Sequence, residues 1–118
     1  MPTVDTAITL IFSYRVIDEE RFQDYLDKVF PVTEADEPYM LEYEIYKNDD
    51  GVYTQHEVYA DGDALAKHFE LTAEGQADWA AATELINLVA LGSPPADWFT
   101  THQIPRAVAF AKFRSVAR

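Results

Sequence analysis

Residues 38–69 read PYMLEYEIYKNDDGVYTQHEVYADGDALAKHF, and this stretch decides the fold. Apolar and polar side chains alternate through 41–46 and again through 52–60, which is the two-residue period of a pleated strand. The sequence NDDG at 48–51 separates the two runs, because Asp and Gly tolerate the positive φ angles that hairpin turns need. The sequence DGD at 61–63 then supplies a helix cap, and apolar residues follow at helical spacing. The stretch predicts a β-hairpin that leads directly into a helix.

The region before the hairpin predicts one strand and one amphipathic helix. Residues 7–17 place a continuous apolar face opposite a mixed one, which is typical of a strand in a sheet that is covered on both sides. Asp18 is a good helix N-cap, and apolar residues recur every three or four positions from Phe22 to Phe30. Pro31 is expected to end or kink this helix, although one further turn is compatible with the sequence.

The region after the hairpin predicts further helix and then a strand. Thr72 is expected to cap a helix that continues to Leu91, because apolar residues recur there at near-helical intervals. The sequence GSPP at 92–95 ends it, and residues 97–103 alternate enough to predict a fourth strand. The tail at 104–118 fits a helix that begins near its proline, or a strand by the alternation around its phenylalanines. We favour the helix.

The predicted order is strand, helix, strand, strand, helix, helix, strand, in one domain of 118 residues. This is the βαββαβ arrangement of a ferredoxin-like sandwich, an α+β fold with a four-stranded antiparallel sheet. Its core is expected at about 7–103, with 104–118 as a C-terminal extension. Helices cover one face of such a sheet, so the apolar residues on the other face need another cover. A second copy is the simplest cover, and we expect a homodimer with two sheets packed face to face.

Composition argues against several classes of partner. The net charge is −12 with only nine Lys and Arg, which disfavours nucleic acid and anionic membrane surfaces as partners. The chain has no cysteine, which removes disulfides, thiolate nucleophiles and iron–sulfur clusters. No apolar run reaches membrane-spanning length, and the N-terminal residues lack the basic region of a secretion signal. We therefore expect a cytoplasmic protein.

The motifs predict no cofactor and no metal. The chain has four glycines and no glycine-rich phosphate loop, so no nucleotide cofactor is implied. Its histidines show none of the HxH, HxxxH or HExxH spacings, so a dedicated metal site at His56 or His102 is not favoured. We place His56, which shares a strand face with Val58, at the expected dimer interface.

Several short motifs within 7–91 together resemble the antibiotic biosynthesis monooxygenase superfamily. They are Glu37-Pro38, the strand LEYEIY at 41–46, Glu57-Val58-Tyr59 and the helix ALAKHF at 64–69. They follow the order of the family's EPG turn, YExY strand, YExW strand and AxxxH helix. The resemblance implies a small dimeric α+β barrel. Members of the family include quinol oxygenases that use no metal or flavin, haem-degrading enzymes and isomerases.

The chain departs from the family pattern at three positions. Tyr39 stands where a glycine usually follows Glu-Pro, and Tyr59 stands where the third strand commonly has tryptophan. Gln55 stands where the cofactor-free oxygenases tend to carry Asn. Of the Asn, Trp and His that characterise the haem-degrading branch, only a histidine is kept. The resemblance therefore favours the quinol-oxygenase type over haem chemistry.

The strand pattern and the resemblance together predict a site between the sheet and the helices. His68 shares a helix stripe with apolar residues, and imidazole can take a proton from an acidic phenol or quinol. Glu57 and Tyr59 share one strand face, where a buried Glu57 can act as a base and Tyr59 can stabilise an oxyanion. These three are the candidate catalytic residues. The candidate substrate-binding residues are Phe12, Tyr14, Gln55, Phe69 and Trp79.

Each of these residues also has a structural interpretation. His68 can be a core histidine, Glu57 can pair with Arg15 or Lys47, and the aromatics can be plain core. The leading hypothesis is a cofactor-independent monooxygenase that acts on a small aromatic or quinol-like substrate. The alternatives are a non-catalytic ligand-binding module and an isomerase that uses the same pocket.

Overall fold

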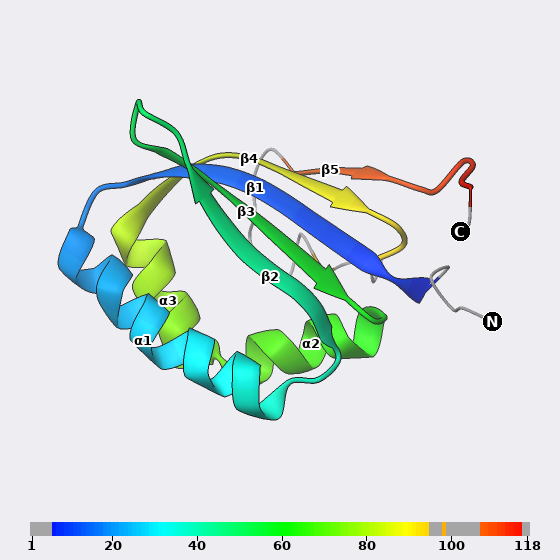
Figure 1. Ribbon diagram of the computed structural model, residues 1–118, viewed down its shortest axis with the longest axis horizontal. Helices are drawn as coiled ribbons and strands as arrows, with labels where there is room; N and C mark the ends of the chain where they lie inside the picture. Colours follow the sequence, from blue (N-terminus) through cyan, green and yellow to red (C-terminus); the bar gives the residue numbers. More distant parts are fainter. Residues whose placement is uncertain (1–5, 95–97, 99–106, 117–118) are drawn as a thin grey trace.

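A layer of helices packs against one face of a single sheet in the computed structural model, which describes residues 6–94, 98 and 107–116 (Figure 1). All helices of the described chain lie on the same side of the sheet, and the other side is open. None of them is long and apolar enough to cross a membrane. The elements in chain order are β1 (Ile8–Val16), α1 (Glu19–Asp36), β2 (Met40–Lys47), β3 (Val52–Tyr59), α2 (Gly62–Leu71), α3 (Ala73–Ala82), β4 (Thr83–Leu91) and β5 (Ala107–Phe110).

The sheet has the strand order β2-β3-β1-β4-β5. The first four strands in this order pair antiparallel, and β5 pairs parallel with β4. The α+β class and the antiparallel βαββαβ core are thus as predicted. The fifth strand is a difference from the predicted four-stranded sheet.

The hairpin and the first helix form for the local reasons that the sequence indicates. Asn48 Oδ1 accepts hydrogen bonds from the backbone N–H groups of Asp50 and Val52, and Gly51 adopts a φ of 80° that favours glycine. The Asp18 side chain caps α1 by accepting from the backbone N–H of Arg21. The helix does not end at its internal proline but continues to Asp36.

The predicted helix after the hairpin is wrong beyond Ala82, where β4 begins. Its pairing with β1 contains a bulge, because Ser13 is opposite Asn87 while the next residue of β1 is opposite Leu85. The extra residue lets Leu85 and Leu88 turn toward the same face although they are three positions apart. This spacing imitates the period of a helix and explains the error. The strand predicted at 97–103 lies outside the described residues, apart from Trp98.

The tail is a strand at Ala107–Phe110, so the helix predicted there is wrong. Val108 pairs with Val89 and Phe110 pairs with Leu91 in a parallel ladder. The alternation of side chains around the phenylalanines predicted the tail better than the position of its proline did. The open edge of β4 offers backbone hydrogen-bond partners that a strand can use and a helix cannot. The residues that follow, 111–116, have no regular structure.

The core lies between the inner face of the sheet and the helices. The apolar face of β1 is buried as predicted, and it packs with residues of α1 and α2. On β2, Tyr43 and Ile45 are partly buried, but Leu41 is 57% exposed. The pairing of β2 with β3 shifts between Met40 and Glu42, and this irregularity turns Leu41 away from the buried face that the alternation predicts.

The close packing of α3 on α1 depends on Gly75. A Cβ at this position would overlap Cγ2 of Val29, which is fully buried. Gly75→Ala is therefore expected to lower the free energy of unfolding by about 1–3 kcal/mol, despite the better helix propensity of alanine. Urea unfolding measures this change, and Val29→Ala in the same chain should return part of the loss. An unchanged urea midpoint for Gly75→Ala would contradict the close packing.

Candidate functional site

A small cavity of about 60 Å³ lies between the sheet and the helices. Its walls are mainly apolar, and Phe12, Phe69 and Trp79 are among the aromatic residues that line it. Glu57 of β3 and Gln76 of α3 bring a carboxyl and an amide to the same wall. Apolar walls with a few converging polar groups are typical of small-molecule sites. The cavity is smaller than the roughly 300–1,000 Å³ of most ligand pockets, so in this conformation it admits only a small group.

Glu57 is the carboxylic acid among the residues that line this cavity, and it is only 2% exposed. The Tyr59 hydroxyl donates to its Oε1, and Gln55 Nε2 donates to its Oε2 at 2.6 Å. Burial raises the pKa of Glu57, and the attraction to His68 and these two hydrogen bonds offset part of the rise. A carboxyl with a raised pKa beside an apolar cavity is suited to proton transfer.

Gln55 connects Glu57 with three tyrosines, of which Tyr14 and Tyr25 are buried and Tyr43 is partly buried. Its Oε1 accepts from the Tyr14 hydroxyl at 2.7 Å, and its Nε2 also donates to the Tyr25 hydroxyl at 2.7 Å. The Tyr25 hydroxyl in turn shares a hydrogen bond with that of Tyr43. The amide is thereby fixed in orientation with both ends occupied, which holds the Glu57 carboxyl in place.

The phenols around Glu57 stay protonated at neutral pH. Burial raises the pKa of Tyr59 well above its ordinary value, and the neighbouring Glu57 charge raises it further. Burial likewise raises the pKa values of Tyr25 and Tyr43. These hydroxyls can therefore act as hydrogen-bond donors to a negative charge in the site.

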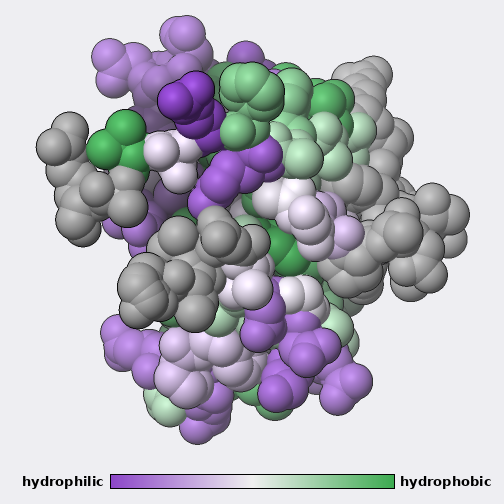
Figure 2. All heavy atoms as spheres, turned by 90° about the vertical axis from the view of Figure 1, so that its right-hand side faces the viewer, coloured by the Kyte–Doolittle hydropathy of each residue, from purple (hydrophilic) through white to green (hydrophobic). Residues whose placement is uncertain are grey.

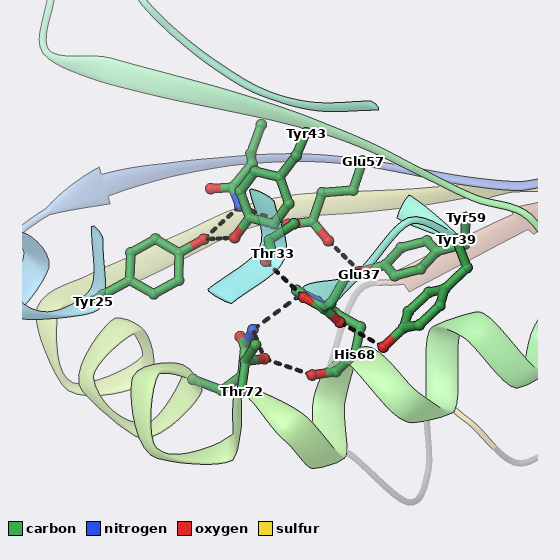
Figure 3. A network of polar contacts seen from close by, with 11 residues as sticks. Tyr25, Thr33, Glu37, Tyr39, Tyr43, Glu57, Tyr59, His68 and Thr72 are labelled. Carbon is green, nitrogen blue, oxygen red and sulfur yellow. Dashed lines mark hydrogen bonds and ion pairs between the residues drawn. The ribbon is translucent and has the colours of Figure 1, made fainter. Parts of the chain in front are cut away.

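His68 forms a buried pair with Glu37, the last residue before the turn into β2 (Figure 3). Its Nδ1 lies 3.0 and 3.1 Å from the two carboxylate oxygens of Glu37, so Nδ1 carries a proton. Glu37 also accepts from the Thr33 hydroxyl at 2.6 Å and from the Tyr39 hydroxyl at 2.9 Å. Four hydrogen-bond contacts compensate the cost of burying this carboxylate.

Gln76 joins this pair to the cavity. Its Nε2 lies 3.4 Å from Nε2 of His68 and donates to the Thr72 hydroxyl at 3.1 Å. The Thr72 hydroxyl donates to the backbone oxygen of His68 at 2.6 Å. His68 itself is not among the residues that line the cavity, and its ring lies against those of Tyr59 and Phe69. His68 is therefore linked to the cavity indirectly, through the side chain of Gln76.

The structure brings the predicted site residues into one region, in two layers. Of the predicted residues, those that line the cavity are Phe12, Glu57, Phe69 and Trp79. The others lie behind its wall and are linked by hydrogen bonds: Gln55 and Tyr59 to Glu57, His68 to Gln76, and Tyr14 to Gln55. Sequence reasoning assigned no role to Glu37 or Gln76. Glu37 was visible only as part of a motif, and nothing in the sequence pattern marks Gln76.

The salt bridges considered for Glu57 do not form. Arg15 donates instead to the backbone oxygen of Asp50 at 3.1 Å. Lys47 lies over the ring of Tyr53, with Nζ 5.4 Å from the ring centre. Both cations belong to the rim of the sheet, whereas Glu57 is turned into the core, so Glu57 has uncharged hydrogen-bond donors.

A second polar group lies on the opposite face of the sheet. His56 Nδ1 is 3.1 Å from Glu42 and 3.8 Å from Glu44, and the Tyr46 hydroxyl donates to Glu44 at 2.8 Å. Within the described chain, these two carboxylates and the imidazole are the one group of three whose ligand atoms come within 4.8 Å of one another. His102, the other histidine considered as a ligand, lies outside the described residues.

The fold is that of solved structures described as antibiotic biosynthesis monooxygenases. One is a proposed enzyme of this kind from Caulobacter crescentus, with a TM-score of 0.61 and 20% identity over 76% of this chain and 92% of that chain. Another is SnoaB from Streptomyces nogalater, described as a cofactor-independent oxygenase, with a TM-score of 0.60 and 12% identity over 77% and 96%. The α+β fold implied by the sequence resemblance is thereby confirmed, and the dimer stays a prediction.

A further structure matches over nearly its whole length. MupZ from Pseudomonas fluorescens has a TM-score of 0.75 and 18% identity, and the match covers 96% of this chain and 95% of that one. No family model and no curated protein sequence matches the chain. At these identities the likeness shows a shared fold.

Proposed function

We propose that the chain is a cofactor-independent oxygenase that acts on a small aromatic or quinol-like substrate in the cavity. The observation that carries the proposal is the Glu57 carboxyl, which is buried, has a raised pKa and lines an aromatic cavity. The shared fold with SnoaB, itself described as a cofactor-independent oxygenase, supports the same activity class. The site residues act as follows.

Glu57 is the base. It removes a proton from a hydroxyl of the quinol, and the resulting anion, which has carbanion character at the neighbouring ring carbon, passes one electron to O₂. The two radicals combine to form a carbon–oxygen bond at that ring carbon, and the peroxide takes the proton back from Glu57. Loss of the C–H proton at the same carbon then breaks the O–O bond, so that one oxygen atom stays as a carbonyl and the other leaves as water. The substrate supplies all the electrons, so the reaction needs no external reductant.

Tyr59 and His68 support this base. Tyr59 remains protonated and donates to Glu57, and it is the nearest phenol to stabilise negative charge that develops beside the carboxyl. His68, held by Glu37, acts from behind the wall, because it attracts the Glu57 carboxylate and contacts Gln76. Phe12, Phe69 and Trp79 offer the apolar walls against which an aromatic ring packs.

Oxygen uptake in the presence of hydroquinones tests the proposal. The native chain should consume O₂, and Glu57→Gln should lower the rate by about 10²–10⁴-fold, because general-base catalysis contributes that much. Tyr59→Phe and His68→Ala should lower it as well. Glu42→Gln, on the opposite face of the sheet, is the matched control and should leave the rate unchanged. Equal rates for the native chain and Glu57→Gln would remove Glu57 from the reaction.

Two other outcomes select the alternative functions. A hydroquinone-dependent rise in melting temperature without oxygen uptake would indicate a ligand-binding module. Conversion of the substrate without oxygen uptake would indicate an isomerase that uses the same base.

We also propose that the chain forms a homodimer through the outer face of its sheet. The helices cover only the inner face (Figure 1). Ile11 and Val58 on the outer face are only partly buried in the single chain, and a second copy would remove these apolar side chains from water.

A further inference from the structure

Gln76 of α3 contributes an amide to the cavity, and the proposed reaction gives this amide no direct contact with the substrate. At the height of the helices, in the lower part of Figure 2, hydrophilic side chains prevail on the surface. The cavity inside is mainly apolar by contrast. A polar group that a ligand cuts off from water costs free energy unless the ligand forms a hydrogen bond with it. Gln76 therefore favours a ligand that carries a polar group at this point.

Thr72 determines which end of this amide faces away from the helices. The Thr72 hydroxyl donates its single proton to the backbone oxygen of His68 at 2.6 Å, so toward Gln76 it can only accept. Gln76 Nε2 is the group that donates to it, at 3.1 Å. Thr72 is only 5% exposed, so little water reaches this contact. The amide nitrogen is thereby held on the side of Thr72, and Oε1 lies on the other side of the amide.

The contact with His68 agrees with this orientation. Nδ1 of His68 carries the proton that is shared with Glu37, so Nε2 of a neutral ring accepts. Gln76 Nε2 lies 3.4 Å from it. One hydrogen of the amide nitrogen is thus directed to Thr72 and the other to His68. No residue in the described part of the chain donates to Gln76 Oε1.

This amide oxygen complements the Glu57 carboxyl as an acceptor in the cavity. Indole N–H groups only donate, so the two tryptophans of the lining offer a ligand no acceptor. The Tyr25 hydroxyl already accepts from Gln55 Nε2 and shares a hydrogen bond with the Tyr43 hydroxyl. Among the side chains described in the lining, a ligand hydroxyl therefore finds its acceptors at Glu57 and Gln76.

We propose that Gln76 determines the specificity of the site by accepting, at Oε1, a hydrogen bond from a second hydroxyl of the substrate. The first hydroxyl donates to Glu57, and a ring that lies along the wall with these two residues reaches both. The substrate class is then a small aromatic ring with two hydroxyls. This inference rests on the proposed function for the reaction of that substrate, whereas the contact with Gln76 requires only that the substrate binds.

A cycle of one protein change and one ligand change tests the contact. Titration calorimetry without oxygen compares phenol with whichever of catechol, resorcinol and hydroquinone binds most tightly. The native chain should bind the dihydroxybenzene about 3–10-fold more tightly than phenol, which is the contribution of one hydrogen bond. Gln76→Met keeps the length of the side chain without the acceptor and should bring this ratio close to one. Its affinity for phenol should stay unchanged, whereas general damage to the site would weaken both ligands.

Two further variants separate the orientation of the amide from its presence. Thr72→Val keeps Gln76 but removes the acceptor that holds its nitrogen, so the preference for the dihydroxybenzene should fall part of the way. Gln23→Met removes an exposed glutamine of α1, whose amide donates to Asp27. Gln23 is not among the residues described in the cavity lining. This variant is the matched control and should keep the native ratio.

Oxygen uptake separates this inference from the proposed function. In a chain that consumes O₂, Gln76→Met should raise KM for the dihydroxybenzene more than it lowers kcat. A native chain without oxygen uptake, whose binding preference Gln76→Met abolishes, would overturn the oxygenase and keep the Gln76 contact. Oxygen uptake together with an unchanged ratio in Gln76→Met would overturn the Gln76 contact alone. A native chain that binds none of these ligands would overturn both.

Discussion

Glu57→Gln should become progressively more stable, relative to the native chain, as pH rises above about 4.5. That is the ordinary pKa of a glutamate, and burial raises the pKa of Glu57 in the folded protein. Below the ordinary value, Glu57 is protonated in both the folded and unfolded states, so its ionisation costs nothing. Between the ordinary and the raised value, only the unfolded state releases the proton, and native stability falls by about 1.4 kcal/mol per pH unit. Glutamine cannot ionise and lacks this loss.

Urea unfolding of both proteins across a pH series measures the effect. The unfolding free energy of Glu57→Gln minus that of the native chain should rise as pH increases from the ordinary pKa of glutamate to the raised pKa of Glu57. Above that pH the difference should level off. Any constant offset from exchanging a hydrogen-bond acceptor for a donor beside Gln55 does not change this slope. Glu34→Gln, at an exposed position of α1, is the control for the loss of one carboxylate. A flat or falling difference curve for Glu57→Gln would show that the folded protein does not favour the protonated carboxyl.

Glu37→Ala is expected to cost about 3–5 kcal/mol of stability, because it leaves a fully buried histidine without its carboxylate. The hydroxyls of Thr33 and Tyr39 lose their acceptor at the same time. Denaturant unfolding at neutral pH measures the loss. Glu34→Ala, at an exposed position near the end of α1, is the control and should stay within about 0.5 kcal/mol of the native chain.

A double-mutant cycle separates the pair from the general cost of a cavity. Glu37→Gln and His68→Asn are made singly and together, and the double variant should recover part of the summed losses, since neither charge is then left unpaired. A coupling energy near zero, or a loss below about 1 kcal/mol for Glu37→Ala, would contradict the buried pair.

Local sequence signals predicted most of the antiparallel core, because turn and cap chemistry act over a few residues. Asp18 and the NDDG turn at 48–51 act through neighbouring backbone N–H groups. The sequence wrongly predicted a helix where β4 lies, because the spacing of its apolar residues depends on tertiary pairing. Only the pairing of β4 with β1 reveals the bulge that places Leu85 and Leu88 on one face. The strand in the tail likewise depends on a partner edge that lies far away in the sequence.

The site residues that lie on one strand could be predicted from the alternation of side chains along that strand. Gln55, Glu57 and Tyr59 share a face of β3, and the structure turns all three inward. The contacts that complete the site join separate elements. Glu37 directly follows α1, His68 lies 31 positions further on in α2, and Gln76 reaches the cavity from α3. No periodicity within one element encodes such contacts, and the cavity itself exists only after the elements pack.

Two of the three departures from the family pattern share a location in the structure. Gln55 and Tyr59 stand where the cofactor-free oxygenases and the wider family tend to carry Asn and Trp, and both donate hydrogen bonds to Glu57. These two residues thus hold the carboxyl that we propose as the base. This chain would therefore organise its proton transfer around Glu57, and a substrate must approach that residue.

A crystal structure of the chain with hydroquinone tests whether Glu57 is the base of the reaction. The ring is expected in the cavity against Phe12 and Trp79, with one hydroxyl within hydrogen-bond distance of the Glu57 carboxyl. A saturated crystal in which hydroquinone binds elsewhere and the cavity stays closed around Glu57 would contradict it.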